Sequence, residues 1–313
     1  HMRWESSEAS SLSSVPDNIS PIRSLRFSKS ADARPCADPQ HIALIVSRRL
    51  SETLQLQDMR QQYTIGKKIG EGAYGNIYKV TCNKSGRVFA LKSVSADRTV
   101  ASNPVEEEIC NSSEFDHPYI VKLHAFFQEE SAFHLIMDFC AGGDLRTYCT
   151  NYIKTLMKTQ PGYRSGLSSK IAARYMWQML NGLTFLHHHG FIHRDIKPEN
   201  YLLVTEKIDS PVRLSDFGMA CRIGKMEKLS RKVGSVHFVA PEVLGGSYNQ
   251  KADVWSLGVT CFGICANSLP FSGLEDREYL ANVKEGRFKD GDHVWEVHWP
   301  QLRNIIRSML IMS

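Results

Sequence analysis

The sequence lacks several features that would assign it to common classes of protein. No apolar run among its 313 residues reaches the roughly 18 that a membrane-spanning helix needs, so we expect no transmembrane segment. The net charge of +5 is modest and gives no reason to expect nucleic acid or a membrane surface as a partner. None of the eight cysteines forms a CxxC pair, so we expect buried, reduced thiols and a cytoplasmic location.

What is present suits a folded catalytic unit. Apolar residues form 42% of the chain, enough for a core, and the length allows one unit of two lobes with extensions. Residues 1–62 form an N-terminal extension, expected to be largely disordered because its first part is rich in serine and lacks periodicity. Apolar residues recur at helical spacing over 42–59. This predicts a short helix that either packs on the smaller lobe or serves regulation or partner docking.

The octapeptide HRDIKPEN, residues 193–200, carries side chains suited to phosphoryl transfer. Asp195 can accept the proton of a substrate hydroxyl, and Lys197 can reach a transferring phosphate. Asn200 can hold a magnesium ion through its side-chain oxygen. The octapeptide therefore predicts a site of phosphoryl transfer, and the other motifs lie before and after it in the sequence.

A second acidic motif, DFG, begins at Asp216, 21 residues after Asp195. Runs over 201–204 and 212–215 predict two short paired strands, and the second of them delivers Asp216. Magnesium prefers oxygen ligands, commonly one or two carboxylates together with phosphate oxygens and water. Asp216 and Asn200 meet that requirement.

β-Rich runs over 63–69, 76–80, 120–123 and 133–137 predict the strands of a sheet. Between the first two lies a glycine-rich turn, GEGAYG, at residues 70–75. The same pattern in dinucleotide-binding folds leads into a helix, whereas here a strand follows. Without Cβ atoms the backbone can lie over phosphate groups. Taken alone, the motif fits that role and a plain glycine hairpin equally well.

A strand over 88–92 places Ala90 and Lys92 on one side, because side chains alternate along a strand. The small side chain at position 90 leaves room for a flat base, and Lys92 would point towards phosphates. The alternative is an ordinary surface lysine. A predicted helix over 104–115 offers three carboxylates that compete to pair with Lys92: Glu106, Glu107 and Glu108.

With these motifs in this order, residues 63–313 resemble the catalytic domain of eukaryotic serine/threonine protein kinases. The resemblance implies a two-lobed α+β fold. It has a small β-rich N-lobe (63–137), a hinge (138–143) and a larger, mostly α-helical C-lobe (144–313). The segment 233–244 is similar to the calmodulin-dependent group, and within it to the calcium-dependent protein kinases of plants and apicomplexan parasites.

The resemblance also implies an activity. The γ-phosphate of Mg-ATP would pass to Ser or Thr of protein substrates that carry basic residues before the target. Lys197 favours Ser and Thr over Tyr as acceptors. Asp144 and Glu199 are the acidic positions that could receive a substrate arginine, and Asp253 would brace the backbone of the octapeptide.

Site residues follow from the same resemblance. Glu108 is selected over Glu107 because it lies ten residues before Pro118. The implied catalytic residues are Asp195, Lys197, Lys92 and Glu108, and the implied magnesium ligands are Asn200 and Asp216. The implied nucleotide-binding residues are Ile69, Gly70, Gly72, Gly75, Ile77, Ala90, Lys92, Met137, Asp138, Cys140, Asp144 and Leu203.

Three features depart from the family pattern. No DxDxDG calcium loop occurs, so calcium or calmodulin dependence is not encoded in this chain. Arg231 stands where the calcium-dependent relatives tend to carry an acid, and it would repel Arg194. Phosphorylation of Ser230 would add a compensating charge. The chain stops at Ser313 inside an expected helix, so we expect the domain to be truncated at its C-terminus.

The competing interpretation is a pseudokinase, a scaffold that binds nucleotide or partners without transfer. Every catalytic side chain is present, which favours an enzyme. A small-molecule kinase is disfavoured, because Ser235 and the segment 240–242 indicate a peptide-binding surface.

Overall fold

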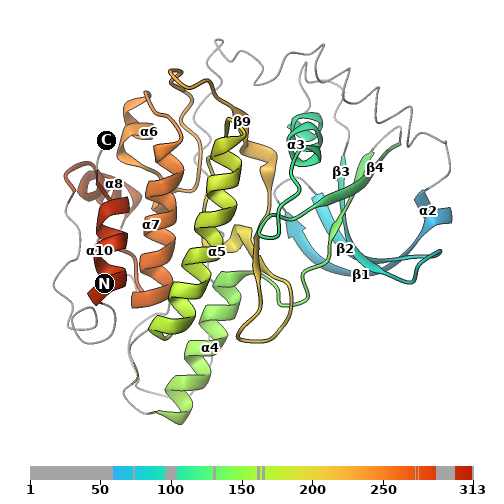
Figure 1. The fold of residues 1–313 in the computed structure, drawn as a ribbon, viewed down its shortest axis with the longest axis horizontal. Coiled ribbons are helices and arrows are strands. Elements are labelled where there is room, and N and C mark those ends of the chain that lie inside the picture. Colours follow the sequence, from blue (N-terminus) through green and yellow to red (C-terminus); the bar gives the residue numbers. More distant parts are fainter. Residues whose placement is uncertain are drawn as a thin grey trace.

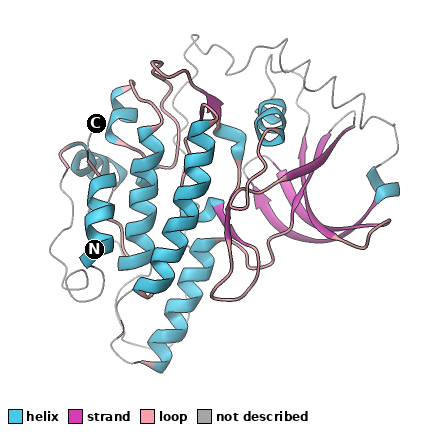
Figure 2. Ribbon diagram, viewed as in Figure 1, coloured by secondary structure: helices cyan, strands magenta, loops and turns pink. Residues whose placement is uncertain are grey.

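The protein folds into two lobes, one rich in strands and the other mostly helical (Figure 1). Figure 2 shows the long strands gathered in the smaller lobe and the long helices in the larger one. The predicted α+β fold is therefore confirmed, whereas the predicted helix over 42–59 lies outside the described residues except for Met59. The computed structural model describes residues 59–72, 75–95, 104–129, 132–160, 163, 166–271, 273, 275–286 and 300–311.

The smaller lobe is built on a five-stranded antiparallel sheet with the strand order β1-β2-β3-β5-β4. The register pairs Ala90 with Met137 and Lys92 with Leu135. The elements of this lobe are α2 (Met59–Gln62), β1 (Tyr63–Gly72), β2 (Gly75–Cys82), β3 (Val88–Ser95), α3 (Pro104–Ser113), β4 (Leu123–Gln128) and β5 (Ala132–Asp138).

Alternation of side chains gives this sheet two apolar faces. On one face Leu135 is buried with Val105 and Ile109 of α3. On the other face its neighbour Ile136 is buried with Met59 of α2. The helix α3 is thus held against the same face of the sheet from which Lys92 projects.

The larger lobe contains most of the helices. These are α4 (Leu145–Thr159), α5 (Ser169–His188), α6 (Pro241–Gly245), α7 (Lys251–Ala266), α8 (Asp276–Lys284) and α10 (Pro300–Met309). Its short strands pair as β6 (Phe191–Ile192) with β9 (Cys221–Arg222), and β7 (Tyr201–Leu203) with β8 (Val212–Leu214). Three 3-10 helices are η1 (Pro198–Asn200), η2 (Phe217–Met219) and η3 (Val236–Phe238). No helix in the described ranges has both the length and the apolar character needed to cross a bilayer.

The centre of the larger lobe is α7, which is apolar all round because protein surrounds it. Trp255 and Leu257 are both buried although they lie on opposite sides of it, and they belong to two different apolar clusters. The helix α10 lies beside it (Figure 1). At Gly258 a Cβ would come within 2.8 Å of the Cβ of Met309, so the approach of the two helices requires glycine there.

The segment before β4 joins the two lobes and corrects one sequence prediction. Residues 120–123 were expected as a strand of the sheet, but β4 begins only at Leu123. Ile120 instead forms an isolated bridge with Leu214 of β8, and the amide of Val121 donates to the carbonyl of Leu214 at 2.8 Å. The β-branched run therefore pairs with the larger lobe, where the backbone of β8 offers the hydrogen bonds.

We predict that Leu257→Ala lowers the free energy of unfolding by about 2–5 kcal/mol, because the side chain is fully buried and its loss leaves a cavity. Urea unfolding monitored by circular dichroism measures the change. Ile208→Ala, at a position that is 41% exposed, serves as the control and should change the value by less than about 1 kcal/mol. Equal effects of the two substitutions would contradict the placement of α7 in the core.

Candidate active site

Within the smaller lobe, a buried ion pair links β3 to α3. The Nζ of Lys92 donates to both carboxylate oxygens of Glu108, at 2.7 and 2.8 Å, and lies 3.4 Å from Oδ1 of Asp216. Lys92 is 6% exposed and Glu108 is 3% exposed. Of the three glutamates that could pair with Lys92, the structure brings Glu108 to it, because this position of α3 faces the sheet.

The charges at this ion pair act against the effect of burial, which still prevails at Glu108 and raises its pKa although Lys92 acts to lower it. Burial by itself would lower the pKa of Lys92, but the negative charges of Glu108 and Asp216 outweigh that effect and raise it above its ordinary value. Burial would raise the pKa of Asp216, yet Lys92, together with His193 and Lys197, lowers it. The site therefore holds a cationic lysine next to an ionised carboxylate at neutral pH.

Asp195 is the centre of a second network, on the larger lobe. Its Oδ2 accepts a hydrogen bond from Nζ of Lys197 at 2.7 Å, and its Oδ1 accepts one from Oγ of Ser235 at 2.8 Å. Lys197 also donates to Oγ of Ser235 at 3.0 Å. Asn200 closes the loop by donating to the carbonyl of Asp195 at 2.7 Å and to its Oδ2 at 3.1 Å. Asp195 thus contacts Lys197, Asn200 and Ser235, all of which the sequence placed at the site.

The packing of Phe217 fixes the direction of the neighbouring Asp216 side chain. Phe217 is buried, with its ring centroid 4.9 Å from that of Phe115 and 5.2 Å from that of His193. Asp216 itself adopts φ 62°, a left-handed conformation that a non-glycine residue rarely takes. The turn places the carboxylate towards Lys92 while the aromatic ring stays under α3. The assignment of Asn200 and Asp216 as magnesium ligands stays a prediction.

The backbone of residues 193–195 is held by Asp253 of α7. Its carboxylate accepts hydrogen bonds from the amides of His193 at 2.7 Å and Arg194 at 2.8 Å, and from Nε2 of His187 at 2.9 Å. Burial would raise the pKa of Asp253, but these donors lower it below its ordinary value. Arg194 has φ 67°, so this brace supports a strained backbone.

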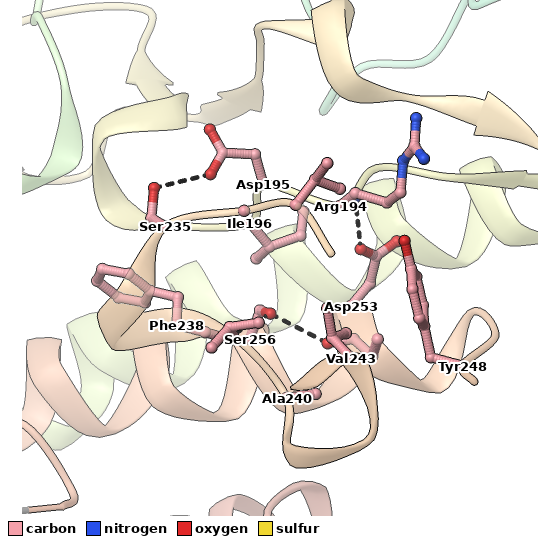
Figure 3. A pocket seen from close by; sticks show the side chains of 14 residues that line it. Arg194, Asp195, Ile196, Ser235, Phe238, Ala240, Val243, Tyr248, Asp253 and Ser256 are labelled. Atoms are coloured by element: carbon pink, nitrogen blue, oxygen red, sulfur yellow. Dashed lines mark hydrogen bonds between the residues drawn. The ribbon is translucent and has the colours of Figure 1, made fainter. Parts of the chain in front are cut away.

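Figure 3 shows how the segment after residue 232 lies against this loop. Ser235 points to Asp195 on one side, while Ser256 of α7 donates to the carbonyl of Phe238 at 2.7 Å on the other. A small cavity remains between the loop, this segment and α7. Gly234 has φ 118° and its missing side chain would meet the carbonyl of Arg194, so glycine is required where the segment turns towards the loop.

Several of the residues predicted to bind a nucleotide lie on β1 and β2, namely Ile69, Gly70, Gly72, Gly75 and Ile77. A Cβ on Gly75 would lie 1.9 Å from the carbonyl oxygen of Ser93, so only glycine fits where β2 returns along β3. Gly72 pairs with Gly75, and Gly70 pairs with Ile77. Ile69 lies on the exposed part of β1.

The linker between the lobes completes this set. Ala90 of β3 is the register partner of Met137 on the neighbouring strand β5. Leu203 of β7 is buried; its carbonyl accepts a hydrogen bond from the amide of Gly142 at 2.9 Å, and its amide donates to the carbonyl of Gly143 at 2.8 Å. Burial raises the pKa of the Cys140 thiol to about 12, which keeps it neutral and unreactive.

Three acidic site residues have partners that the sequence did not reveal. The carboxylate of Asp138 accepts hydrogen bonds from the amide of Lys122 at 3.0 Å, from His124 at 2.8 Å and from Arg213 at 2.6 Å. Asp144 caps α4 by accepting from the amide of Thr147 at 2.8 Å. Glu199 forms an ion pair with Arg146. No local sequence signal could have predicted the arginine partners of Asp138 and Glu199, because Arg213 and Arg146 lie on other elements of the fold.

Glu107, the alternative partner of Lys92, interacts electrostatically with two arginines of the larger lobe. Burial raises its pKa, and the positive charges of Arg194 and Arg231 act against that rise. The expected repulsion between these two arginines is therefore moderated by a carboxylate from α3. Arg231 is also held through its backbone, because the hydroxyl of Tyr248 donates to its carbonyl at 2.6 Å.

A five-stranded lobe with a buried lysine–glutamate pair, set against a helical lobe that presents Asp195, Lys197 and Asn200, defines the protein kinase class of fold. The sequence model of the protein kinase domain matches residues 63–313. The chain belongs to the protein kinase domain family.

Its relatives include calcium-dependent protein kinases. Calcium-dependent protein kinase 5 of Plasmodium berghei is 30% identical over 252 residues, covering 80% of this chain and 43% of the relative. Calcium-dependent protein kinase 29 of Arabidopsis thaliana is 31% identical, covering 81% and 46%. Serine/threonine-protein kinase PEPKR2 of the same plant is 32% identical, covering 83% and 52%. The chain thus spans about half the length of the curated relatives it matches.

We predict that Asp253→Asn lowers the free energy of unfolding at pH 7 by about 2–4 kcal/mol, since its amide group would face backbone donors. The pKa of Asp253 is depressed in the folded protein, so its contribution is present above the ordinary pKa of about 3.9 and is lost as the pH falls below it. The wild type should therefore lose stability below that pH more steeply than the variant. Urea unfolding at a series of pH values measures both effects. The exposed Asp209→Asn is the control, and parallel pH curves for wild type and Asp253→Asn would contradict the prediction.

Proposed function

We propose that this chain is a protein serine/threonine kinase that transfers the γ-phosphate of Mg-ATP to Ser or Thr of protein substrates with basic residues before the target. The observation that carries the proposal is the contact of Asp195 with both Lys197 and Ser235, beside the ion pair of Lys92 and Glu108. The family membership and the relatives named as calcium-dependent and serine/threonine protein kinases support it.

Asp195 would orient the acceptor hydroxyl and take its proton. Its two oxygens are held by Lys197 and Ser235, so the carboxylate is positioned before a substrate arrives. Lys197 stands at the same point and would neutralise charge on the transferring phosphoryl group. Most of the acceleration would come from positioning and from preorganised charge.

The residues between the lobes fit Mg-ATP. Gly75 ends the glycine-rich turn, which would lie over the phosphates, and Lys92 stays cationic and would grip them. Asn200 and ionised Asp216 supply the oxygens that would hold magnesium. When bound, magnesium neutralises negative charge on the phosphates.

Regulation by calcium is a separate question. The names of two relatives say that they are calcium-dependent, but no DxDxDG loop occurs in this sequence. We therefore propose that this chain does not bind calcium through such a loop, so that transfer by the chain alone does not depend on calcium. Transfer by the isolated chain that rises on adding calcium alone would contradict this part of the proposal.

We predict that Asp195→Asn lowers phosphate transfer by at least about 100-fold while nucleotide binding is retained. The measurement is transfer of labelled γ-phosphate from Mg-ATP to a basic Ser peptide, with nucleotide affinity determined by fluorescence. Asp209→Asn, at an exposed position, is the control and should be fully active. Full turnover by Asp195→Asn would exclude the role, and binding without transfer by the wild type would indicate a nucleotide-binding scaffold.

We predict that Ser235→Ala lowers kcat by about tenfold, because Asp195 and Lys197 each lose a hydrogen-bond partner. Ser235→Thr keeps the hydroxyl and should retain most of the activity. Steady-state kinetics with the same peptide separates kcat from KM. A Ser235→Ala enzyme with the wild-type kcat would show that the hydroxyl has no part in positioning Asp195.

A further inference from the structure

Arg146 is a positively charged residue at a helix N-terminus, a position that disfavours positive charge. It lies in the first turn of α4, directly after the Leu145 that begins the helix, and this turn contains no acidic residue. The partial positive charge of a helix N-terminus disfavours a cation there. Positions where a sequence departs from such preferences are often functional.

The guanidinium of Arg146 contacts the loop that contains Asp195. Its Nη1 lies 2.5 Å from Oε1 of Glu199, and both side chains are 26% exposed. Glu199 belongs to η1, four residues after Asp195. The second carboxylate oxygen of Glu199 is buried and accepts no hydrogen bond from the described residues. An ionised oxygen in that setting depends on nearby positive charge, so Arg146 stabilises Glu199.

The segment that follows Ser235 reaches the same place. His237 of η3 has its pKa lowered by burial, and it interacts electrostatically with both Arg146 and Glu199. Ser235, two residues earlier, touches Asp195. Glu199 and Arg146 are thus in contact, and His237, whose charged partner is Asp276, is within electrostatic range of both; we call Glu199, Arg146 and His237 the Glu199 subsite.

We propose that Arg146 is a specificity-determining residue whose guanidinium occupies Glu199, so that the Glu199 subsite does not select a basic residue of the substrate. The proposal rests on the proposed kinase function and refines it, because the preference for a basic residue is then left to Asp144. A substrate arginine would have to replace an arginine that is already part of the protein. Such an exchange gains little, since the internal group has a high effective concentration and loses no freedom on binding.

The test uses peptides with Ser in an Ala-rich background and one Arg at each position from two to six before the Ser. The wild type should show no affinity gain at the position that the Glu199 subsite serves. In Arg146→Ala, one position should gain about tenfold in affinity, seen as a lower KM. Arg146→Gln, which keeps most of the packing, should show the same gain if the alanine variant folds poorly. The gain should disappear in the double variant Arg146→Ala/Glu199→Gln.

Lys158→Ala removes a positive charge from the exposed last turn of the same helix and is the matched control. It should keep the wild-type profile. Binding of peptides with Ala in place of Ser is measured by fluorescence anisotropy, so the inference is tested even if transfer fails. Absence of transfer with a gain in binding by Arg146→Ala would reject the proposed function alone. A wild type that already prefers Arg through Glu199, or a gain at every position, would overturn the role of Arg146.

Discussion

The bidentate contact between Lys92 and Glu108 connects the parts of this molecule that must act together. It joins the sheet to α3, and α3 in turn covers Phe217, whose ring fixes the turn that aims Asp216. Because Asp216, whose side chain is 38% exposed, also approaches Lys92, the two lobes meet at one cluster of opposite charges. Losing either partner would leave an uncompensated buried charge, which is far more destabilising than losing an exposed ion pair.

Much of the site could be predicted because its chemistry is contiguous in the sequence. Asp195, Lys197 and Asn200 lie within one octapeptide, and the structure brings them into direct contact. The fold class followed from the resemblance of these ordered motifs to the protein kinase catalytic domain. The choice among the three glutamates needed a family spacing, since helical phase alone leaves neighbouring residues in competition until the packing of α3 is known.

Contacts made between distant elements could not be predicted. Glu199 was expected to await a substrate arginine, yet Arg146 from α4 holds it. Glu107 was considered only as a partner of Lys92, yet it moderates the charges of Arg194 and Arg231. The run at 120–123 has strand propensity, but β8 captures its start before the sheet does. In each case a tertiary partner decides the outcome, and sequence proximity carries no information about it.

The linker residue Asp138 also bears on how the lobes move. Its one carboxylate holds the amide of Lys122 ahead of β4, His124 within β4, and Arg213 on the larger lobe. Rotation of one lobe against the other would lengthen the hydrogen bonds that these donors make to Asp138. We therefore expect the linker to resist such a rotation. The acceptor and Arg213 are 18% and 27% exposed, and dissolved ions therefore screen part of the attraction between them. We therefore expect the amplitude of rotation between the lobes to increase with the ionic strength of the solution.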